Sequence, residues 1–395
     1  MPKLADFENC TGCGACMVSC SKNCITMRDN GIGVVVPFVD TNTCIECHAC
    51  ERSCPAISPE VFHGSMKVYA AWNNDMSARS TSASGGIASA IYDFIKKKGG
   101  YTIGAVLNAD WSVDLVVSNP SEDYAEFKNS KYTFSSPYLI YSRLRELVKE
   151  GALVVLIGLP CQIAGFRKKL GDKDNIIYID LVCHGVTPNS YLKQHIAFLE
   201  KVIGEKAYKL SFRAPEKGTA NYYFTLYDNN NNIIYSKRSS QGEVYNYAFH
   251  RSISYRENCY NCHYARPERC SDITIGDYHG LGKVAECEYD ENEVSVILVN
   301  TPKGDELISD MIKSNVVFAQ QRPLNEPIEG DRQLRHPSSK SIERIYFEKY
   351  ISQTDGDFEA AMRLVGRQIK INNLKQLIKQ APRRVARKIL NLMRR

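Results

Sequence analysis

Two cysteine motifs near the N-terminus constrain this chain more than any other feature. Both have the spacing C-x2-C-x2-C-x3-C, and together they contain Cys10, Cys13, Cys16, Cys20, Cys44, Cys47, Cys50 and Cys54. This spacing is typical of segments that hold cubane 4Fe-4S clusters, because three closely spaced thiolates can surround one cluster while the fourth reaches a second cluster. We therefore expect two 4Fe-4S clusters and one-electron chemistry.

Two other uses of these cysteines fit the sequence less well. A structural zinc site needs four ligands, usually from two C-x2-C knuckles, whereas these cysteines come in triplets. A disulfide framework is not expected, because the chain opens without a signal peptide and its 395 residues do not require covalent staples. Thiolate clusters suit a reducing compartment, so we expect a cytoplasmic protein.

The segment 1–62 resembles the bacterial 2x(4Fe-4S) ferredoxin domain. The clusters of that family are cross-ligated, which implies one cluster on Cys10, Cys13, Cys16 and Cys54 and the other on Cys44, Cys47, Cys50 and Cys20. Ser21 stands where the first motif usually has proline, and Cys24 is close enough in sequence to be a substitute ligand. We expect Cys20 to be the ligand, because it keeps the spacing of the motif.

The residues that follow predict a larger mixed α/β domain over 67–350. Continuous apolar runs predict strands at 67–72, 104–107, 115–118, 153–157, 176–181, 273–276 and 294–300. Helical periodicity and end signals predict helices at 87–98, 138–149, 162–170 and 191–203. We expect an α+β chain, in which a small two-cluster ferredoxin-like module precedes the larger domain. That domain would have an N-terminal half (67–150), a C-terminal half (151–350) and a deep junction between them.

A second group of cysteines lies far from the first. Cys161 and Cys183 each follow an apolar, strand-like run, and strand ends are where α/β folds build their sites. Cys259 and Cys262 form a C-x2-C knuckle that needs two more ligands, which Cys161 and Cys183 could supply. From spacing alone, a third cluster, a zinc ion and free thiols are all consistent with this group.

Six motifs in order give nearly the whole chain a wider resemblance. They are Ser82-Ala83-Ser84-Gly85-Gly86, Ser130-Lys131-Tyr132, Gly158-Leu159-Pro160-Cys161-Gln162, Cys183-His184-Gly185-Val186, Cys259-x2-Cys262 and the run from Ser271 to Tyr278. Together they resemble the beta-subunit family of coenzyme F420 hydrogenases and dehydrogenases. The resemblance implies a flavin-binding domain that exchanges electrons with a 4Fe-4S cluster, and it implies a third cluster on Cys161, Cys183, Cys259 and Cys262.

Two departures from the family pattern concern the substrate side of the flavin. Leu159 replaces the usual threonine before Pro160, and His279 replaces an aromatic residue after Tyr278. We therefore expect the substrate to be either the deazaflavin coenzyme F420 or another small organic molecule.

The chemistry of clusters also favours a flavin if the chain is an enzyme. Clusters exchange single electrons whereas organic substrates usually exchange hydrides, and a flavin can do both. The Gly85-Gly86 turn before a helix would offer N–H groups to a phosphate. We expect the flavin, FAD in preference to FMN, to contact Ser82, Ser84, Gly85, Gly86, Ser130, Lys131 and Tyr132. The alternatives are an ordinary helix turn and a solvated surface lysine. No GxGxxG follows a strand and no P-loop motif occurs.

Three polar residues beside the expected site loops are acid–base candidates, namely His184, Asp277 and His279. Histidine titrates near neutral pH and could protonate a reduced substrate. Alternatively, His184 orders a cysteine-bearing loop and Asp277 caps a turn. We therefore name no catalytic residue.

The basic character of the chain is concentrated at its C-terminal end. The net charge is +6, yet residues 360–395 alone hold eleven Lys or Arg and no acid. Apolar residues recur among them at helical spacing, which predicts a basic amphipathic tail. The tail would contact the inner face of an anionic membrane or an acidic partner, or it would pack on its own domain. No apolar stretch reaches 18 residues, and nothing favours nucleic-acid binding.

Together these patterns predict an iron-sulfur flavoprotein oxidoreductase. Electrons would pass between a ferredoxin-type carrier, the 4Fe-4S clusters and a flavin that reduces or oxidises a small molecule. The alternative is a non-catalytic subunit that relays electrons to a partner oxidoreductase.

Overall fold

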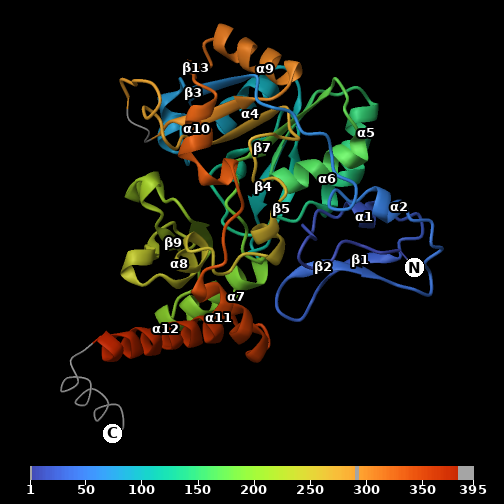
Figure 1. Ribbon diagram of the computed structural model, residues 1–395. Coiled ribbons are helices and arrows are strands. Elements are labelled where there is room, and N and C mark those ends of the chain that lie inside the picture. The colour runs from blue at the N-terminus through green and yellow to red at the C-terminus, as the bar shows by residue number, and fades with distance from the viewer. Residues whose placement is uncertain (1, 290–292, 381–395) are drawn as a thin grey trace.

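The computed structural model describes residues 2–289 and 293–380 of this α/β protein (Figure 1). A small N-terminal module lies beside a larger domain built on an eight-stranded mixed sheet, and a second group of helices and short strands lies below that sheet. We call this second group the lower core. The class expected from the sequence, a small ferredoxin-like region followed by a larger mixed α/β domain, is confirmed.

The N-terminal module has little regular structure. Its hairpin consists of β1 (Ile25–Asp29) and β2 (Val35–Val39), and the single-turn helices α1 (Ala15–Val18) and α2 (Ala49–Arg52) lie inside the two cysteine motifs. Gly14, before α1, has a φ of +76°, and a Cβ there would lie 2.5 Å from the Tyr138 ring. Glycine is therefore required at this close contact between the module and the larger domain.

The large sheet has the strand order β13-β3-β12-β11-β7-β6-β4-β5. Its strands are β3 (Lys67–Asn73), β4 (Tyr101–Leu107), β5 (Val113–Ser118), β6 (Val154–Gly158), β7 (Ile176–Leu181), β11 (Ile273–Asp277), β12 (Ser295–Val299) and β13 (Val317–Arg322). Strands β4, β6, β7 and β11 run parallel to one another. Each of the other four strands, β5, β12, β3 and β13, pairs antiparallel with its neighbours in the sheet.

Helices cover both faces of this sheet. Val155 and Ile157 of β6 face α4 (Ile87–Lys97) and α9 (Pro302–Lys313), whereas Val154 and Leu156 face α5 (Tyr141–Lys149) and α6 (Pro160–Leu170). Alternate residues of each central strand are thus buried on opposite sides, which explains the continuous apolar runs in the sequence. Two shorter helices, α3 (Met76–Ser80) and α10 (Asn325–Gly330), flank the sheet.

The lower core packs the remaining elements around aromatic side chains. They are α7 (Asn189–Ile203), β8 (Lys209–Ser211), β9 (Phe224–Tyr227), β10 (Ile233–Lys237), α8 (Val244–His250), α11 (Ile342–Gln353) and α12 (Phe358–Gln380). The strands form a separate three-stranded antiparallel sheet. α11 and α12 lie along the bottom of the molecule in Figure 1.

All seven expected strands and the four expected helices are present, with ends shifted by a few residues. The sheet crosses the boundary expected at residue 150, because β4 pairs with β6 and β3 lies between β12 and β13. The expected basic tail begins inside α12, where Ala361, Met362 and Val365 are buried in the lower core, and its residues 381–395 lie outside the described residues. None of the described helices is both long and apolar enough to cross a bilayer.

Candidate functional site

The candidate site lies where three neighbouring parallel strands end. Cys161 follows β6, Cys183 follows β7, and Asp277 is the last residue of β11. β6 pairs with β7, and β7 pairs with β11, so their carboxyl ends meet at one edge of the sheet. Loops at such an edge are free to converge on a ligand, because each strand delivers its loop to the same side.

The second cysteine group converges at this edge. Cys161, Cys183, Cys259 and Cys262 line one small cavity, which we call the four-cysteine site. Burial, and then the neighbouring thiols, raise the pKa of Cys161 well above its usual value, and burial and Cys262 raise the pKa of Cys259 to about 12. Thiols with a raised pKa that line one cavity can ionise together only beside a cation, and a metal centre would supply that charge.

The spacing of these sulfur atoms distinguishes between kinds of metal centre. Four sulfurs on one zinc ion lie about 3.8 Å apart, since each Zn–S bond is about 2.3 Å long. Among the described residues, His184, His279 and Asp331 are the only set of three or more potential ligands with all donor atoms within 4.8 Å of one another. The four-cysteine site does not meet this criterion, so its sulfurs do not all lie as close together as one zinc ion requires.

The cysteines of the N-terminal module separate into two groups. Burial and the thiols of Cys13, Cys10 and Cys54 raise the pKa of Cys16, which places the first three cysteines of motif one beside the last cysteine of motif two. The second group lines another small cavity and consists of Cys20, Cys24, Cys44, Cys47 and Cys50. This division matches the cross-ligated arrangement expected from the resemblance.

Cys24 belongs to the second group as closely as Cys20 does. Their sulfur atoms lie 3.2 Å apart, and Cys24 is the more buried of the two. The hydrogen bond with Cys20, followed by burial, raises the pKa of Cys24 to about 12. The choice of Cys20 as the ligand therefore stays a prediction.

The module packs against the larger domain through its first cysteine group. A Cβ on Gly165 of α6 would lie 3.0 Å from the Cys13 sulfur, so this helix contacts the cysteine directly. Tyr141 donates a hydrogen bond of 2.9 Å to the Cys13 carbonyl oxygen. Thr11 lines the four-cysteine site, whose Cys161 lies one helical turn before Gly165. The first cysteine group and the four-cysteine site are therefore adjacent.

Arg256 connects these two sites, and the sequence analysis did not single it out. Its side chain is only 2% exposed, and it donates hydrogen bonds to the carbonyl oxygens of Val35 and Cys10 at 3.1 and 3.4 Å. Its guanidinium stacks over the Phe134 ring, 4.7 Å from the centroid. The signal available in the sequence was a basic residue shortly before the Cys259 knuckle.

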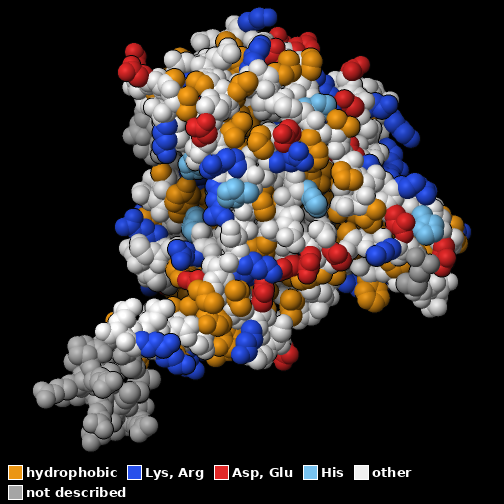
Figure 2. Space-filling model, viewed as in Figure 1, with side chains coloured by type: hydrophobic (Ala, Val, Ile, Leu, Met, Phe, Trp, Pro, Cys, Tyr) orange, Lys and Arg blue, Asp and Glu red, His pale blue; other side chains and the backbone are white. Residues whose placement is uncertain are grey.

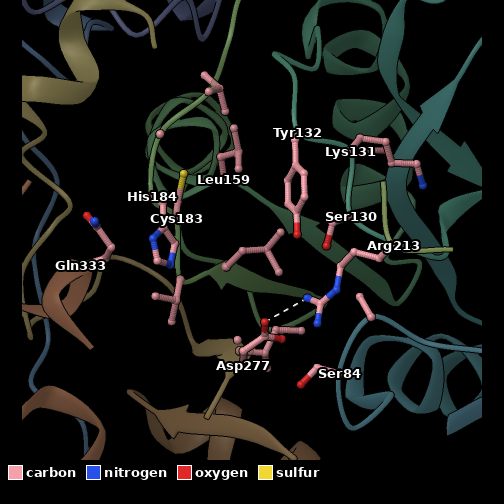
Figure 3. A pocket seen from close by; sticks show the side chains of 18 of the residues that line it. Ser84, Ser130, Lys131, Tyr132, Leu159, Cys183, His184, Arg213, Asp277 and Gln333 are labelled. Carbon is pink, nitrogen blue, oxygen red and sulfur yellow. Dashed lines mark hydrogen bonds and ion pairs between the residues drawn. The ribbon is translucent and has the colours of Figure 1, made fainter. Parts of the chain in front are cut away.

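A large cavity opens beside the four-cysteine site, and we call it the main cavity. Its volume is about 760 Å³, which is in the range of cofactor and substrate sites. The two cavities share a wall that consists of Leu159, Cys183, His184, Gly185, Val186 and Gln333. Figure 3 shows Cys183, His184 and Gln333 on one side of the main cavity, opposite Ser130 and Arg213.

The N-terminus of α4 faces the main cavity. Gly86, its N-cap residue, has a φ of +78° and makes no side-chain cap, and the first helical residues Ile87, Ala88 and Ser89 also line the cavity. The N–H groups of such a first turn have no helical partner and favour an anion. A Cβ on Gly86 would approach Asn73, Arg79 and Ser82 at 3.2 to 3.3 Å, so the turn is closely packed.

The other residues of this loop have different surroundings. Gly85 is not among the residues that line the cavity, and a Cβ there would lie 2.6 Å from the Ala71 carbonyl oxygen of β3. Its absence of a side chain lets the loop pack on the sheet. Ser82 and Ser84 line the cavity, but their hydroxyls donate to the carbonyl oxygens of Ala78 and Val294. These serines therefore hold the loop in place.

The second expected contact segment lies on the opposite wall. Ser130, Lys131 and Tyr132 all line the main cavity. The Lys131 ammonium donates to two backbone carbonyls, of Glu126 and Lys128, and Figure 3 shows it turned away from Tyr132. Burial lowers the pKa of Lys131 to about 7. Lys131 is therefore neither an ordinary solvated lysine nor, in this conformation, directed at the centre of the cavity.

Asn129, which the sequence analysis did not select, carries an unused acceptor in the same wall. Its Oδ1 is buried and has no hydrogen-bond partner, and its φ of +67° lies in the left-handed region. An unpaired buried acceptor is costly, so this oxygen is available to a hydrogen-bond donor, either a water molecule or a ligand.

Asp277 has a charged partner. Its Oδ2 lies 2.9 Å from Nη1 of the buried Arg213, and Figure 3 shows this ion pair across the main cavity from His184. Further basic residues line the cavity, among them Arg251, Arg332 and Lys340. Figure 2 shows Lys, Arg and His side chains gathered in the middle of the face that Figure 1 presents, between the large sheet and the lower core. The cavity therefore suits a ligand with negative charge.

The two remaining cysteines lie outside these sites. Cys270 is 1% exposed, and its sulfur is 3.8 Å from the Pro160 carbonyl oxygen. Neither Cys270 nor Cys287 lines the four-cysteine site.

Comparisons with known proteins match two parts of the chain. Residues 151–323 match the family described as the C terminus of the coenzyme F420 hydrogenase/dehydrogenase beta subunit, and residues 9–57 match the 4Fe-4S dicluster domain. No curated protein matches the chain. A chain in a structure of the F420-reducing [NiFe] hydrogenase complex from Methanosarcina barkeri is 16% identical with a TM-score of 0.41, over 78% of this chain and 92% of that one. Residues 151–323 are thus similar to the C-terminal region of the coenzyme F420 hydrogenase/dehydrogenase beta subunit, and they follow a segment similar to the 4Fe-4S dicluster domain.

Proposed function

We propose that this chain is an iron-sulfur flavoprotein oxidoreductase that passes electrons between a ferredoxin-type carrier and a small organic molecule. An oxidoreductase role and a 4Fe-4S domain are supported by these two matches. The flavin, the third cluster and the nature of the substrate are the content of the proposal.

The observation that carries the proposal is the contact between three sites in series. The first cysteine group packs on α6 at Gly165, the four-cysteine site begins on the same helix at Cys161, and Cys183 lines both that site and the main cavity. A chain of neighbouring redox centres that ends at a cavity is what an enzyme needs to deliver single electrons to an organic cofactor.

The main cavity has the features that a flavin requires. The uncapped first turn of α4 would hold a phosphate group, and the unpaired Asn129 Oδ1 would accept a hydrogen bond from a ring or adenine N–H. When bound, a flavin would exchange single electrons with the clusters and a hydride with the substrate. The volume of the cavity admits FAD, which we propose in preference to FMN.

The opposite end of the series faces solvent. Cys47 of the second cysteine group is exposed, and Cys20 and Cys44 are partly exposed. An external carrier would therefore exchange electrons at this end of the module, at the end of the series of redox centres opposite the main cavity. The basic C-terminal tail is a second candidate contact for an acidic partner or a membrane surface.

Metal and flavin analysis tests the proposal. Protein purified without oxygen should contain about twelve iron and twelve labile sulfides, which is the content of three cubane clusters, and about one flavin. Cys259→Ser with Cys262→Ser should remove about four iron and leave the signals of the two ferredoxin clusters intact. Cys287→Ser is the matched control and should lose none.

Three results would contradict the proposal. About eight iron in the parent protein, or unchanged iron in the double variant, would remove the third cluster. Iron without flavin would favour the second candidate, a subunit that only relays electrons to a partner. Turnover of an organic acceptor by the flavin-loaded protein with dithionite would exclude that candidate.

A further inference from the structure

The main cavity contains a cluster of potential metal ligands that are not among the proposed flavin contacts or cluster ligands. His184 follows β7, His279 follows β11, and Asp331 begins the turn after α10. Their donor atoms, two imidazole nitrogens and one carboxylate oxygen, all lie within 4.8 Å of one another, and all three residues line the main cavity. Three separate loops thus bring these donors to one point.

Asp331 offers a carboxylate oxygen to this cluster. Its side chain is only 5% exposed and forms no ion pair with any Lys or Arg of the described residues. One carboxylate oxygen accepts a hydrogen bond of 2.8 Å from the backbone N–H of Gln333, and no donor among the described residues reaches the other oxygen. Asp331 lines the main cavity, so this second oxygen is available to a cation there.

The two imidazole rings are also free to bind a metal. Within the described residues, no hydrogen bond is formed by either ring, and the ring centroids lie 6.4 Å apart at an angle of 79°. The backbone of His184 is held by Ser338, which donates to its carbonyl oxygen at 2.9 Å. The loop is therefore fixed while the ring can turn.

The three donor atoms need to move only a short distance to bind one ion together. Nitrogen and oxygen ligands of a tetrahedral zinc lie about 3.4 Å apart, so each pair of donors would close by at most roughly 1.4 Å. Rotation of the two unrestrained rings supplies such a movement. Two histidines and one carboxylate are a common ligand set for zinc and for non-haem iron(II), and three protein ligands leave a position open to a substrate.

We propose that His184, His279 and Asp331 bind one divalent first-row transition metal, of the zinc(II) or iron(II) class, in the wall of the main cavity. The open coordination position faces the cavity, where an oxygen atom of the substrate would bind. The metal site itself does not depend on the flavin, whereas its use by a substrate rests on the function proposed above.

Zinc binding by the cluster-loaded protein tests this site. Zinc(II) is added to anaerobically purified protein with its full iron content, and bound zinc is measured after equilibrium dialysis. The parent should bind one equivalent. His279→Phe and Asp331→Asn should each weaken binding by at least about 100-fold, because even the loss of a supporting residue costs 10- to 100-fold. His250→Phe, which changes another cavity histidine, should bind zinc like the parent.

X-ray absorption at the zinc edge provides a second measurement that needs no variant. The bound zinc should have only nitrogen and oxygen neighbours, at about 2.0 to 2.2 Å. Sulfur in the first shell would place the zinc in a cysteine site and overturn the proposal. So would the absence of a stoichiometric zinc ion, or equal binding by the parent, His279→Phe and Asp331→Asn. If the flavin proposal fails while one zinc is bound with this shell, the metal site stands by itself.

Discussion

A buried histidine of the lower core should make the stability of this protein depend on pH. His195 of α7 is 2% exposed and lies between two carboxylates from other elements. Its Nδ1 forms a hydrogen bond of 2.5 Å with Glu359 of α12, and its Nε2 forms an ion pair at 2.7 Å with Glu243, the N-cap residue of α8. Protonated His195 therefore links three helices.

The magnitude follows from the pKa shift. Burial opposes protonation, but Glu243 and Glu359 outweigh it and raise the pKa of His195 from 6.5 to about 9. A shift of about 2.5 units corresponds to about 3 kcal/mol. Since the folded pKa lies above the unfolded one, this contribution is fully present below pH 6.5. It is lost as the pH rises through about 9, because the neutral ring leaves two buried carboxylates without a cation.

Urea unfolding at several pH values measures the effect. Trp111 packs against the lower core, so tryptophan fluorescence reports its unfolding. The parent should be more stable than His195→Gln by about 3 kcal/mol at about pH 6.5, and the difference should close by about pH 9.5. The control is His250→Gln, because burial lowers the pKa of His250 to about 4 and its charge does not change in this window.

The reasoning would be refuted by a difference between the parent and His195→Gln that stays constant from about pH 6.5 to about pH 9.5. It would also be refuted if His250→Gln removed the pH dependence as fully as His195→Gln does.

Three further predictions concern the redox centres. Arg256→Met should lower the potential of the nearer ferredoxin cluster, because Arg256 contacts the Cys10 carbonyl oxygen. A unit charge at an assumed separation on the order of 8 Å contributes about 2 kcal/mol, or roughly 90 mV, at an effective dielectric constant of about 20. An unchanged midpoint in an EPR-monitored redox titration would contradict this. Gly86→Val should lose the flavin because it strains a closely packed turn, whereas Gly64→Val, which has open space around it, should keep the flavin in an absorbance assay. Cys20→Ala should disrupt one ferredoxin cluster and Cys24→Ala should leave both intact in an iron assay, and the reverse outcome would reassign the ligand.

The sequence was most informative where the chemistry is local. The cysteine motifs place three ligands within seven residues, so their spacing alone predicts a cluster. The central strands were equally clear, because burial on both faces requires unbroken apolar runs such as the one that contains Val154 and Ile157. The edge strand β13 ends in two glutamines and an arginine, and it was not predicted.

Residue roles within the site were harder to assign. Gly85 and Gly86 are adjacent and identical in type, yet one packs on the sheet and the other faces the main cavity. Lys131 has the expected position but directs its ammonium to two backbone carbonyls. Such differences depend on the direction of each backbone group, which the residue type does not encode.

Short segments were enough to predict that this chain holds iron-sulfur clusters and continues into a mixed α/β domain, because ligand spacing and strand burial are properties of a few neighbouring residues. Which sites are neighbours depended instead on the folded chain. Folding brought Cys13 against Gly165 and placed Arg256 near both Cys10 and Cys259. It also brought His184 close to Asp331, which lies on a separate loop. These contacts join residues far apart in the chain, and they depend on how packed surfaces fit together.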